Sequence, residues 1–162
     1  TLTAFDLDGT TLTLDINQIG DTNKFLGDIY GNSITGFFEF DGDTNTFTIQ
    51  GDPTNTFGIN NSNYNVDVTG NTNTFTLNHG TAALDIDGAT SFLDIDGDNN
   101  NLTYDGDGAA GGYFYLDQTG NNRNWTIKQQ STLNNDWLKI ISNTSGGTLC
   151  IIQNDGGTST TC

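Results

Sequence analysis

A repeat of nine residues runs through the middle of the chain and constrains the fold more than any other feature of the sequence. In each repeat a bulky apolar residue is followed two places later by a second apolar residue. Alternation with a period of two is typical of a strand that buries one face. The first positions are Phe57, Val66, Phe75, Leu84, Leu93 and Leu102, and the second are Ile59, Val68, Leu77, Ile86, Ile95 and Tyr104.

Turn residues separate these apolar pairs. A glycine recurs four places after the first apolar position, as at Gly70 and Gly97, and an amide precedes the next unit, as at Asn73 and Asn100. Glycine and asparagine favour tight turns, and a chain rich in Thr, Asn, Asp and Gly forms helices poorly. We expect each inward asparagine to hydrogen bond to turn backbone and to the amides in neighbouring coils.

A nine-residue unit cannot bury its apolar face alone, but stacked units can. The sequence therefore predicts an all-β fold, a β-solenoid of about seven coils with two short strands per coil. Two units make a central coil of about 18 residues, and three strands in a coil of about 28 residues are the alternative. We expect residues 1–149 to form the solenoid and residues 150–162 to form a C-terminal capping tail. Trp125 and Trp137 are expected in the core, although Leu138 is an alternative inward residue to Trp137. The other interpretation of the two tryptophans is a platform on which sugars stack.

The charge of −16 excludes several classes of partner. It argues against nucleic acid, whose backbone is bound by Lys and Arg, and against anionic membrane surfaces. No apolar run approaches the ~20 residues of a membrane-spanning helix, so membrane insertion is not expected. The chain begins at Thr1 rather than Met, and we expect it to be a processed product. With His79 as the only histidine and no nucleophile elbow, we expect no enzyme activity.

Acidic residues recur at outward positions of the central units. With two units per coil, Asp67 should stack on Asp85, and Asp87 on Asp105. One interpretation is a solvated acidic face that keeps the protein soluble. The other is calcium, whose hard cation would bridge the repelling carboxylates. The candidate calcium ligands are Asp85, Asp87, Asp94, Asp96, Asp98, Asp105 and Asp107.

Two further features have competing interpretations. Cys150 and Cys162 are the only cysteines, and in a secreted chain they predict a disulfide that closes the tail, whereas in a cytosolic chain they would be free thiols. Thr-x-Thr pairs, as at Thr74 and Thr76, suit an ice-binding array only if they repeat in successive coils. Coils of two units place Gly58 and Asp94 beside Thr76, which favours ordinary outward strand residues.

The outer units carry a pattern of Gln, Gly and Asn. Gln18, Gly20 and Asn23 precede Phe25, and Gln118 and Gly120 precede Trp125 with Arg123 at the asparagine position. These segments resemble curlin repeats. The resemblance covers about 80 residues at the two ends, and it implies a secreted subunit that stacks end to end into an adhesive fibre. Similar Asn/Thr/Gly solenoids also resemble modules of phage fibres.

The function expected from these features is structural and non-catalytic. Terminal coils present strand edges that pair with other strands unless they are covered, so the first partner expected is another copy of the chain. The alternatives are a virion fibre or appendage protein, and a monomeric adhesion module that binds calcium or a glycan. The expected location is extracellular or on a virion surface.

Overall fold

The computed structural model describes residues 5–50, 59–79, 88–108, 112–131, 136–155 and 161, and all the regular elements in these ranges are β-strands. The strands form two sheets. The eight-stranded sheet contains β1 (Phe5–Gly9), β3 (Lys24–Asn32), β5 (Thr46–Gln50), β6 (Ile59–Asn60), β8 (Thr74–His79), β10 (Asn101–Gly108), β12 (Arg123–Ser131) and β14 (Gly147–Asp155). The six-stranded sheet contains β2 (Leu12–Ile19), β4 (Ile34–Asp41), β7 (Asn63–Thr69), β9 (Thr90–Asp96), β11 (Tyr113–Thr119) and β13 (Trp137–Asn143).

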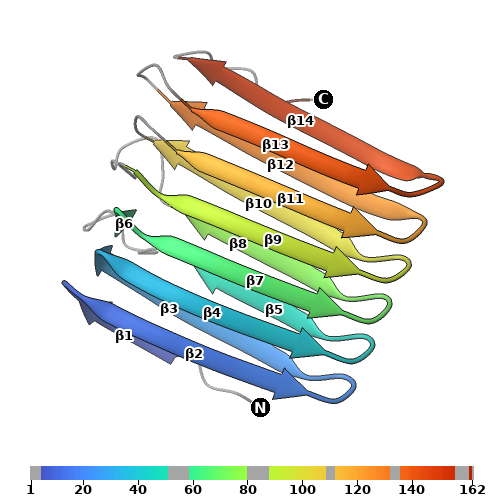
Figure 1. Cartoon of the computed structure of the whole chain (residues 1–162), viewed down its shortest axis with the longest axis horizontal. Coiled ribbons are helices and arrows are strands. Elements are labelled where there is room, and N and C mark those ends of the chain that lie inside the picture. The colour runs from blue at the N-terminus through green and yellow to red at the C-terminus, as the bar shows by residue number, and fades with distance from the viewer. Residues whose placement is uncertain are drawn as a thin grey trace.

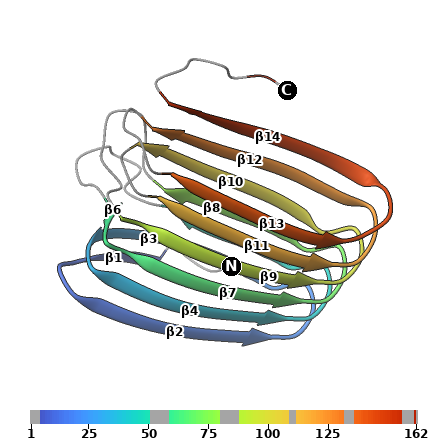
Figure 2. The ribbon, with the colours of Figure 1, turned by 45° about the horizontal axis from the view of Figure 1, so that its top comes forward.

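The two sheets face each other as the walls of a β-solenoid. Apart from the two-residue β6, successive strands alternate between the sheets, and every recorded pairing is parallel. The first strands, β1 and β2, lie at one end of the stack, and β13 and β14 lie at the other (Figures 1 and 2). The predicted all-β solenoid is therefore confirmed, with two main strands per coil, one from each sheet, and the short β6 as an addition to one coil.

The central coils are longer than expected. Phe47 pairs with Phe75, and Phe75 pairs with Leu102, so one coil takes 28 residues and the next takes 27, which is three units rather than two. Two nine-residue units form the long strands of such a coil. Of the third unit, Ile59 lies in the short strand β6, which pairs with β3, whereas Phe57, Leu84 and Ile86 lie outside the described residues. Because the coils are longer, the six-stranded sheet holds only six strands, and the chain completes fewer coils than the seven predicted.

The inward side chains form one continuous core. The members of the repeated apolar pairs from Val66 to Tyr104 whose side chains are described are all buried, and aromatic rings meet between the sheets. The rings of Phe40 and Phe47 stack with centroids 3.7 Å apart, and those of Tyr104 and Phe114 stack at 3.9 Å. The buried members of the pairs are Val66, Val68, Phe75, Leu77, Leu93, Ile95, Leu102 and Tyr104.

The two tryptophans lie in different environments. Trp125 is buried, as predicted. The core prediction is wrong for Trp137, which is 42% exposed, because Leu138 takes the inward position and packs against the core.

Tight turns connect each strand of the six-stranded sheet to the next strand of the eight-stranded sheet. At these turns Gly70 and Gly97 have φ angles of 126° and 133°. A Cβ atom on Gly97 would collide with the carbonyl oxygen of Gly70 in the preceding coil. Only glycine combines this backbone conformation with so close an approach, which explains why glycine recurs in the repeat.

Asparagine side chains link the coils inside these turns. The backbone N–H of Asn23 donates to Oδ1 of Asn45 at 2.6 Å, that of Asn45 to Asn73 at 2.7 Å, and that of Asn73 to Asn100 at 2.8 Å. Asn45, Asn73 and Asn100 are buried. The predicted hydrogen bonds from the inward asparagines to turn backbone are confirmed, but the predicted bonds between their amide side chains are not found, since Nδ2 of Asn45 and of Asn73 has no partner within the described residues. We call Asn23, Asn45, Asn73 and Asn100 the asparagine ladder.

The last strand continues past the predicted end of the solenoid at residue 149. β14 runs to Asp155 and pairs with β12 from Gly147↔Arg123 to Asp155↔Ser131. Cys150 therefore lies in a strand of the solenoid and not in a separate tail.

Candidate functional site

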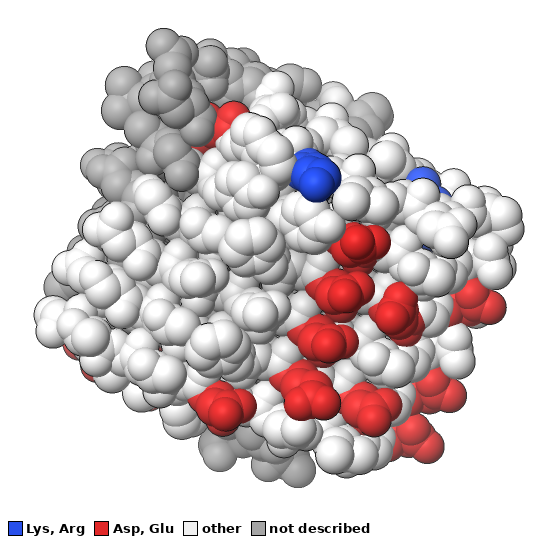
Figure 3. Space-filling view, viewed as in Figure 1, with Lys and Arg blue, Asp and Glu red and all other residues white. Residues whose placement is uncertain are grey.

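A column of carboxylates crosses the outer face of the six-stranded sheet. Its members occupy equivalent positions in four successive strands, so neighbouring side chains are one strand apart, about 4.8 Å. Figure 3 shows these acidic side chains as a row across the strands, with further acidic residues toward the turns. We call Glu39, Asp67, Asp94 and Asp117 the acidic column.

The two carboxylates in the middle of the column, Asp67 and Asp94, have raised pKa values. Partial burial raises the pKa of Asp67, and the negative charges of Asp96 and Asp41 raise it further. Burial also raises the pKa of Asp94, followed by the charges of Asp96, Asp67 and Asp117. Each charged carboxylate is therefore disfavoured by its surroundings, and a bound cation would relieve the repulsion.

Aromatic side chains lie beside the acidic column. Two columns of outward positions next to the acidic column contain aromatic residues. The nearer column holds Phe37, Phe92 and Tyr115, and the further column holds Tyr113 and Trp137. Tyr113 and Trp137 stack with centroids 4.1 Å apart and an interplanar angle of 7°. The Phe92 ring lies 5.5 Å from Tyr113 and 5.9 Å from Tyr115. We call these five residues the aromatic group.

The exposure of these rings is unusual for a sheet face. Phe37 is 47% exposed, Phe92 is 38% exposed and Trp137 is 42% exposed. Scattered apolar residues are common on protein surfaces, but contiguous apolar patches generally mark interaction sites. The acidic column and the aromatic group together are the strongest candidate site on the described surface, and we call them the acidic–aromatic face.

The residues proposed as calcium ligands are not all brought together. Asp94 and Asp96 point outward from β9 on the six-stranded sheet, whereas Asp105 lies on β10 of the opposite sheet. There Asp105 forms an ion pair with Lys128, with Nζ and Oδ1 3.5 Å apart. Asp85 and Asp87 lie outside the described residues, as does the side chain of Asp107.

The predicted stacking of acidic residues two units apart is wrong for the residues that can be placed. Asp67 stacks on Asp94, three units further along the chain, and Asp105 lies between Asn78 and Lys128. The cause is the coil length. In a coil of three units, the residue stacked on Asp67 is 27 positions along the sequence, one unit further than the ~18 expected for two units. Repelling carboxylates do stack on this protein, but they are a different set from the one predicted.

Asp98 has a structural role in the turns. Its Oδ1 accepts the backbone N–H of Asn121 at 2.7 Å, and its own N–H donates to Oδ1 of Asn71 at 2.7 Å. Equivalent bonds join Asp43 to Asp21 and Asn71 to Asp43. The chain thus carries a second, exposed ladder at the turns, and the sequence pattern Gly-Asp or Gly-Asn marks it. Within the described ranges, no group of three or more His, Cys, Asp or Glu side chains is arranged to hold a metal ion.

The threonine pairs have different neighbours from those predicted. Thr76 lies between Thr48 and Thr103, and Thr126 continues the column, so threonines do repeat across the eight-stranded sheet. The argument from Gly58 and Asp94 is therefore wrong. The adjacent column changes from threonine to Asn101 and Asn124, so that Thr-x-Thr pairs occur in only two successive described coils.

Cys150 is disulfide-bonded, and the described part of the chain contains no free cysteine. Cys162 lies outside the described residues, so its pairing with Cys150 stays a prediction.

The acidic–aromatic face was not apparent in the sequence. Its columns can be aligned only when the number of residues in each coil is known, and these numbers vary between 22 and 28. The sequence did contain one signal, which is the presence of two adjacent apolar residues, as in Phe37-Phe38 and Trp137-Leu138. Because neighbouring residues of a strand point to opposite faces, one residue of each pair must point outward.

Comparisons with known proteins do not assign the chain to a family. No family model, no curated protein and no solved structure matches it. None of the described residues form a helix long and apolar enough to cross a membrane. The assignment that stands is therefore one of architecture: a β-solenoid built from sequence repeats.

Proposed function

We propose that this structural repeat protein is a non-catalytic subunit that stacks end to end into an extracellular fibre, as the resemblance to curlin repeats implies. A virion fibre with the same axial stacking is the alternative setting. The observation that carries the proposal is that two core-column side chains, Leu149 and Ile151, are exposed at the C-terminal end of the described strands.

The uncovered residues are apolar and occupy core positions. Leu149 pairs with Trp125, and Ile151 pairs with Ile127, so all four belong to inward columns. Trp125 and Ile127 are buried, whereas Leu149 is 42% exposed and Ile151 is 41% exposed. Covering these two side chains with another coil would remove apolar surface from water at about 25 cal/mol per Å².

The N-terminal end has the same character. Phe5 is 39% exposed, and Leu12, Leu14 and Ile16 pack against the core but are only partly buried. Exposed apolar residues at both ends of the solenoid favour head-to-tail contact between identical subunits. Such contacts form open filaments when the rotation from one subunit to the next does not close into a ring.

The terminal strands are also open to pairing. Among the described residues, β1 and β2 at one end, and β13 and β14 at the other, each pair with one strand only. Proteins commonly protect such edges with Lys or Pro. Of these four strands only β13 contains Lys, Arg or Pro, in the form of Lys139.

Electron microscopy and light scattering of the purified chain test the proposal. We expect filaments from the unmodified protein and dispersed particles from Ile151→Lys, because a lysine would place a charge on the axial surface. Ile141→Lys is the matched control, since Ile141 is also 41% exposed but points outward from the six-stranded sheet. Filaments that persist in Ile151→Lys, or a wild-type protein that stays monodisperse, would contradict axial stacking.

A further inference from the structure

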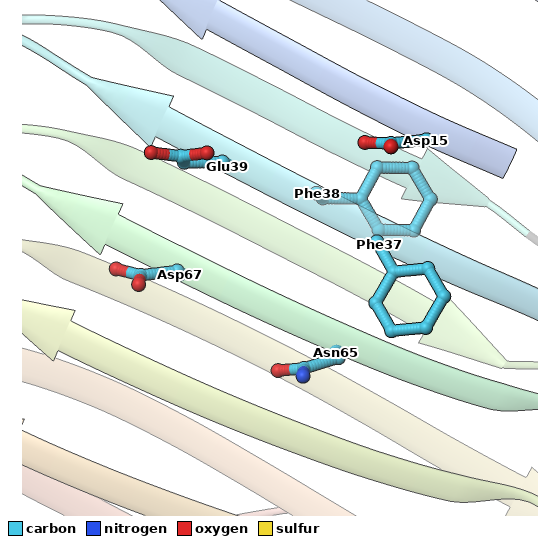
Figure 4. A pocket seen from close by; sticks show the side chains of 6 residues that line it. All are labelled: Asp15, Phe37, Phe38, Glu39, Asn65 and Asp67. Carbon is cyan, nitrogen blue, oxygen red and sulfur yellow. The ribbon is translucent and has the colours of Figure 1, made fainter.

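The acidic–aromatic face runs parallel to the stacking axis, so axial assembly leaves it accessible. The face contains a hollow of about 190 Å³ lined by Asp15, Phe37, Phe38, Glu39, Asn65 and Asp67. In Figure 4 the exposed Phe37 ring lies between Asp15 and Asn65 of the adjacent strands, with Glu39 and Asp67 beside it. The hollow thus combines an exposed apolar ring with negatively charged side chains from adjacent strands.

Its carboxylates have no cationic partner on the described surface. No ion pair is recorded within the described ranges for Asp15, Glu39, Asp67 or Asp94, and Glu39 accepts only the neutral amide of Asn17, at 2.8 Å. Carboxylates at strand spacing repel one another. The surface is therefore complementary to a ligand that carries several positive charges.

One end of the face shows how a cation fits there. Lys139 occupies the same column as Phe37, Phe92 and Tyr115, and its Nζ lies 5.0 Å from the centre of the Tyr115 ring. The Tyr115 hydroxyl donates to Oδ2 of Asp117 at 3.2 Å. An ammonium group over a ring beside a carboxylate is an arrangement stabilised by cation–π attraction. Phe37 and Phe92 have no ammonium group beside them from the next strand, because the residues at the position of Lys139 are Asn65 and Tyr115.

The spacing of the rings favours a polymer of sugar rings over a single small cation. Phe37 and Phe92 are two strands apart in one column, about 9.5 Å, which is close to the length of a disaccharide in an extended β-linked glycan. Pyranose rings present apolar C–H faces that pack on aromatic rings, and free amino groups would form charge-assisted hydrogen bonds with the adjacent carboxylates. We propose that the acidic–aromatic face binds a glycan with free amino groups, laid along the solenoid axis.

Binding of a hexamer of β-1,4-linked glucosamine tests this proposal, with calorimetry and the fluorescence of the exposed Trp137 as readouts. We expect Phe37→Ala to weaken binding about tenfold, a change in line with the loss of a desolvated cation–π contact. Thr103→Ala, on the outward face of the opposite sheet, is the control and should bind as the unmodified protein does. Equal affinity of Phe37→Ala and the unmodified chain would overturn the site.

The acidic part is tested with charge-matched variants. Asp67→Asn combined with Asp94→Asn should weaken binding of the hexamer about tenfold or more. Asp6→Asn combined with Asp8→Asn removes the same charge from β1 and should leave the affinity within about twofold. Equal losses in both double variants would show that net charge alone attracts the ligand and would overturn the proposal.

Two further ligands define the specificity. The N-acetylated hexamer, which has the same rings without positive charge, should bind at least tenfold more weakly than the glucosamine hexamer. Hexalysine should also bind more weakly, because it lacks the sugar rings whose apolar C–H faces pack on the aromatic group. If either ligand matches the glucosamine hexamer in affinity and in sensitivity to Phe37→Ala, the assignment to amino-sugar glycans is wrong.

Discussion

At the scale of single residues, glycine sets how closely the coils approach. Gly97 has a left-handed φ and lies against the carbonyl oxygen of Gly70, and Gly120 lies against Gly97 in the same way. The sequence repeat identified these glycine positions. The close contact between successive turns explains why glycine is required there.

Replacing Gly97 with alanine should destabilise the fold by more than about 1 kcal/mol, because both the φ angle and the space exclude a Cβ. Urea unfolding followed by circular dichroism measures the effect. Gly112→Ala is the control, since a Cβ there meets neighbours no closer than 3.4 Å and Gly112 lacks a positive φ. Similar losses in both variants would contradict the explanation.

The acidic column makes a prediction about pH. The raised pKa of Asp94 means that the folded state binds its proton more tightly than the unfolded state does. Stability therefore falls as pH rises from the ordinary value of 3.8 through the raised pKa. Asp94→Asn should accordingly stabilise the protein at neutral pH, by roughly 0.2–1 kcal/mol for so exposed a group.

The gain from Asp94→Asn should vanish below pH 3.8, where Asp94 is protonated in both states. Urea unfolding at neutral and acid pH compares the two proteins. A gain that is the same at both pH values would show that Asp94 acts through something other than its charge.

At the scale of strands and turns, the sequence predicted what each unit does but not how many units close a coil. Alternation identified Val66, Val68 and Leu93 as inward residues, and these positions are buried. The repeat is equally compatible with coils of two units and coils of three, because both keep every unit in register with its neighbours. The choice depends on the connections between strands, which carry no signal as strong as the repeat.

The same ambiguity hid the candidate site. Outward residues form columns only through coil length, so Asp67 was matched with Asp85 and not with Asp94. Phe37, Phe38 and Phe40 allowed more than one alignment, and the structure places Phe38 and Phe40 in the core and Phe37 outside.

The asparagine ladder should contribute more stability than the exposed turn ladder. Asn73→Ala leaves the buried N–H of Asn45 without its acceptor, which costs about 1–3 kcal/mol. Asn71→Ala removes a bond to the Asp98 N–H that is equally short but exposed, so water can replace it and the loss should be smaller. Denaturant titrations that rank Asn71→Ala as the more damaging change would contradict this assignment.

At the scale of the whole molecule, net charge opposes the assembly proposed here. Each subunit carries −16, so neighbouring subunits in a filament repel one another. Salt reduces this repulsion, since the Debye length is about 10 Å at 0.1 M ionic strength. Assembly followed by light scattering should therefore accelerate between about 0.01 M and 0.15 M salt. A rate that falls over this range would indicate that attraction between opposite charges, and not burial of the open core columns, drives association.

Fibre diffraction combined with cryo-electron microscopy of the assembled protein tests end-to-end stacking most directly. If solenoids continue into one another, the strands lie across the fibre, and a meridional reflection should appear at about 4.8 Å. With six strands in one sheet and seven in the main path of the other, each subunit should then advance by about 29–34 Å along the axis. A subunit repeat unrelated to this rise, or strands that run along the fibre, would contradict the account.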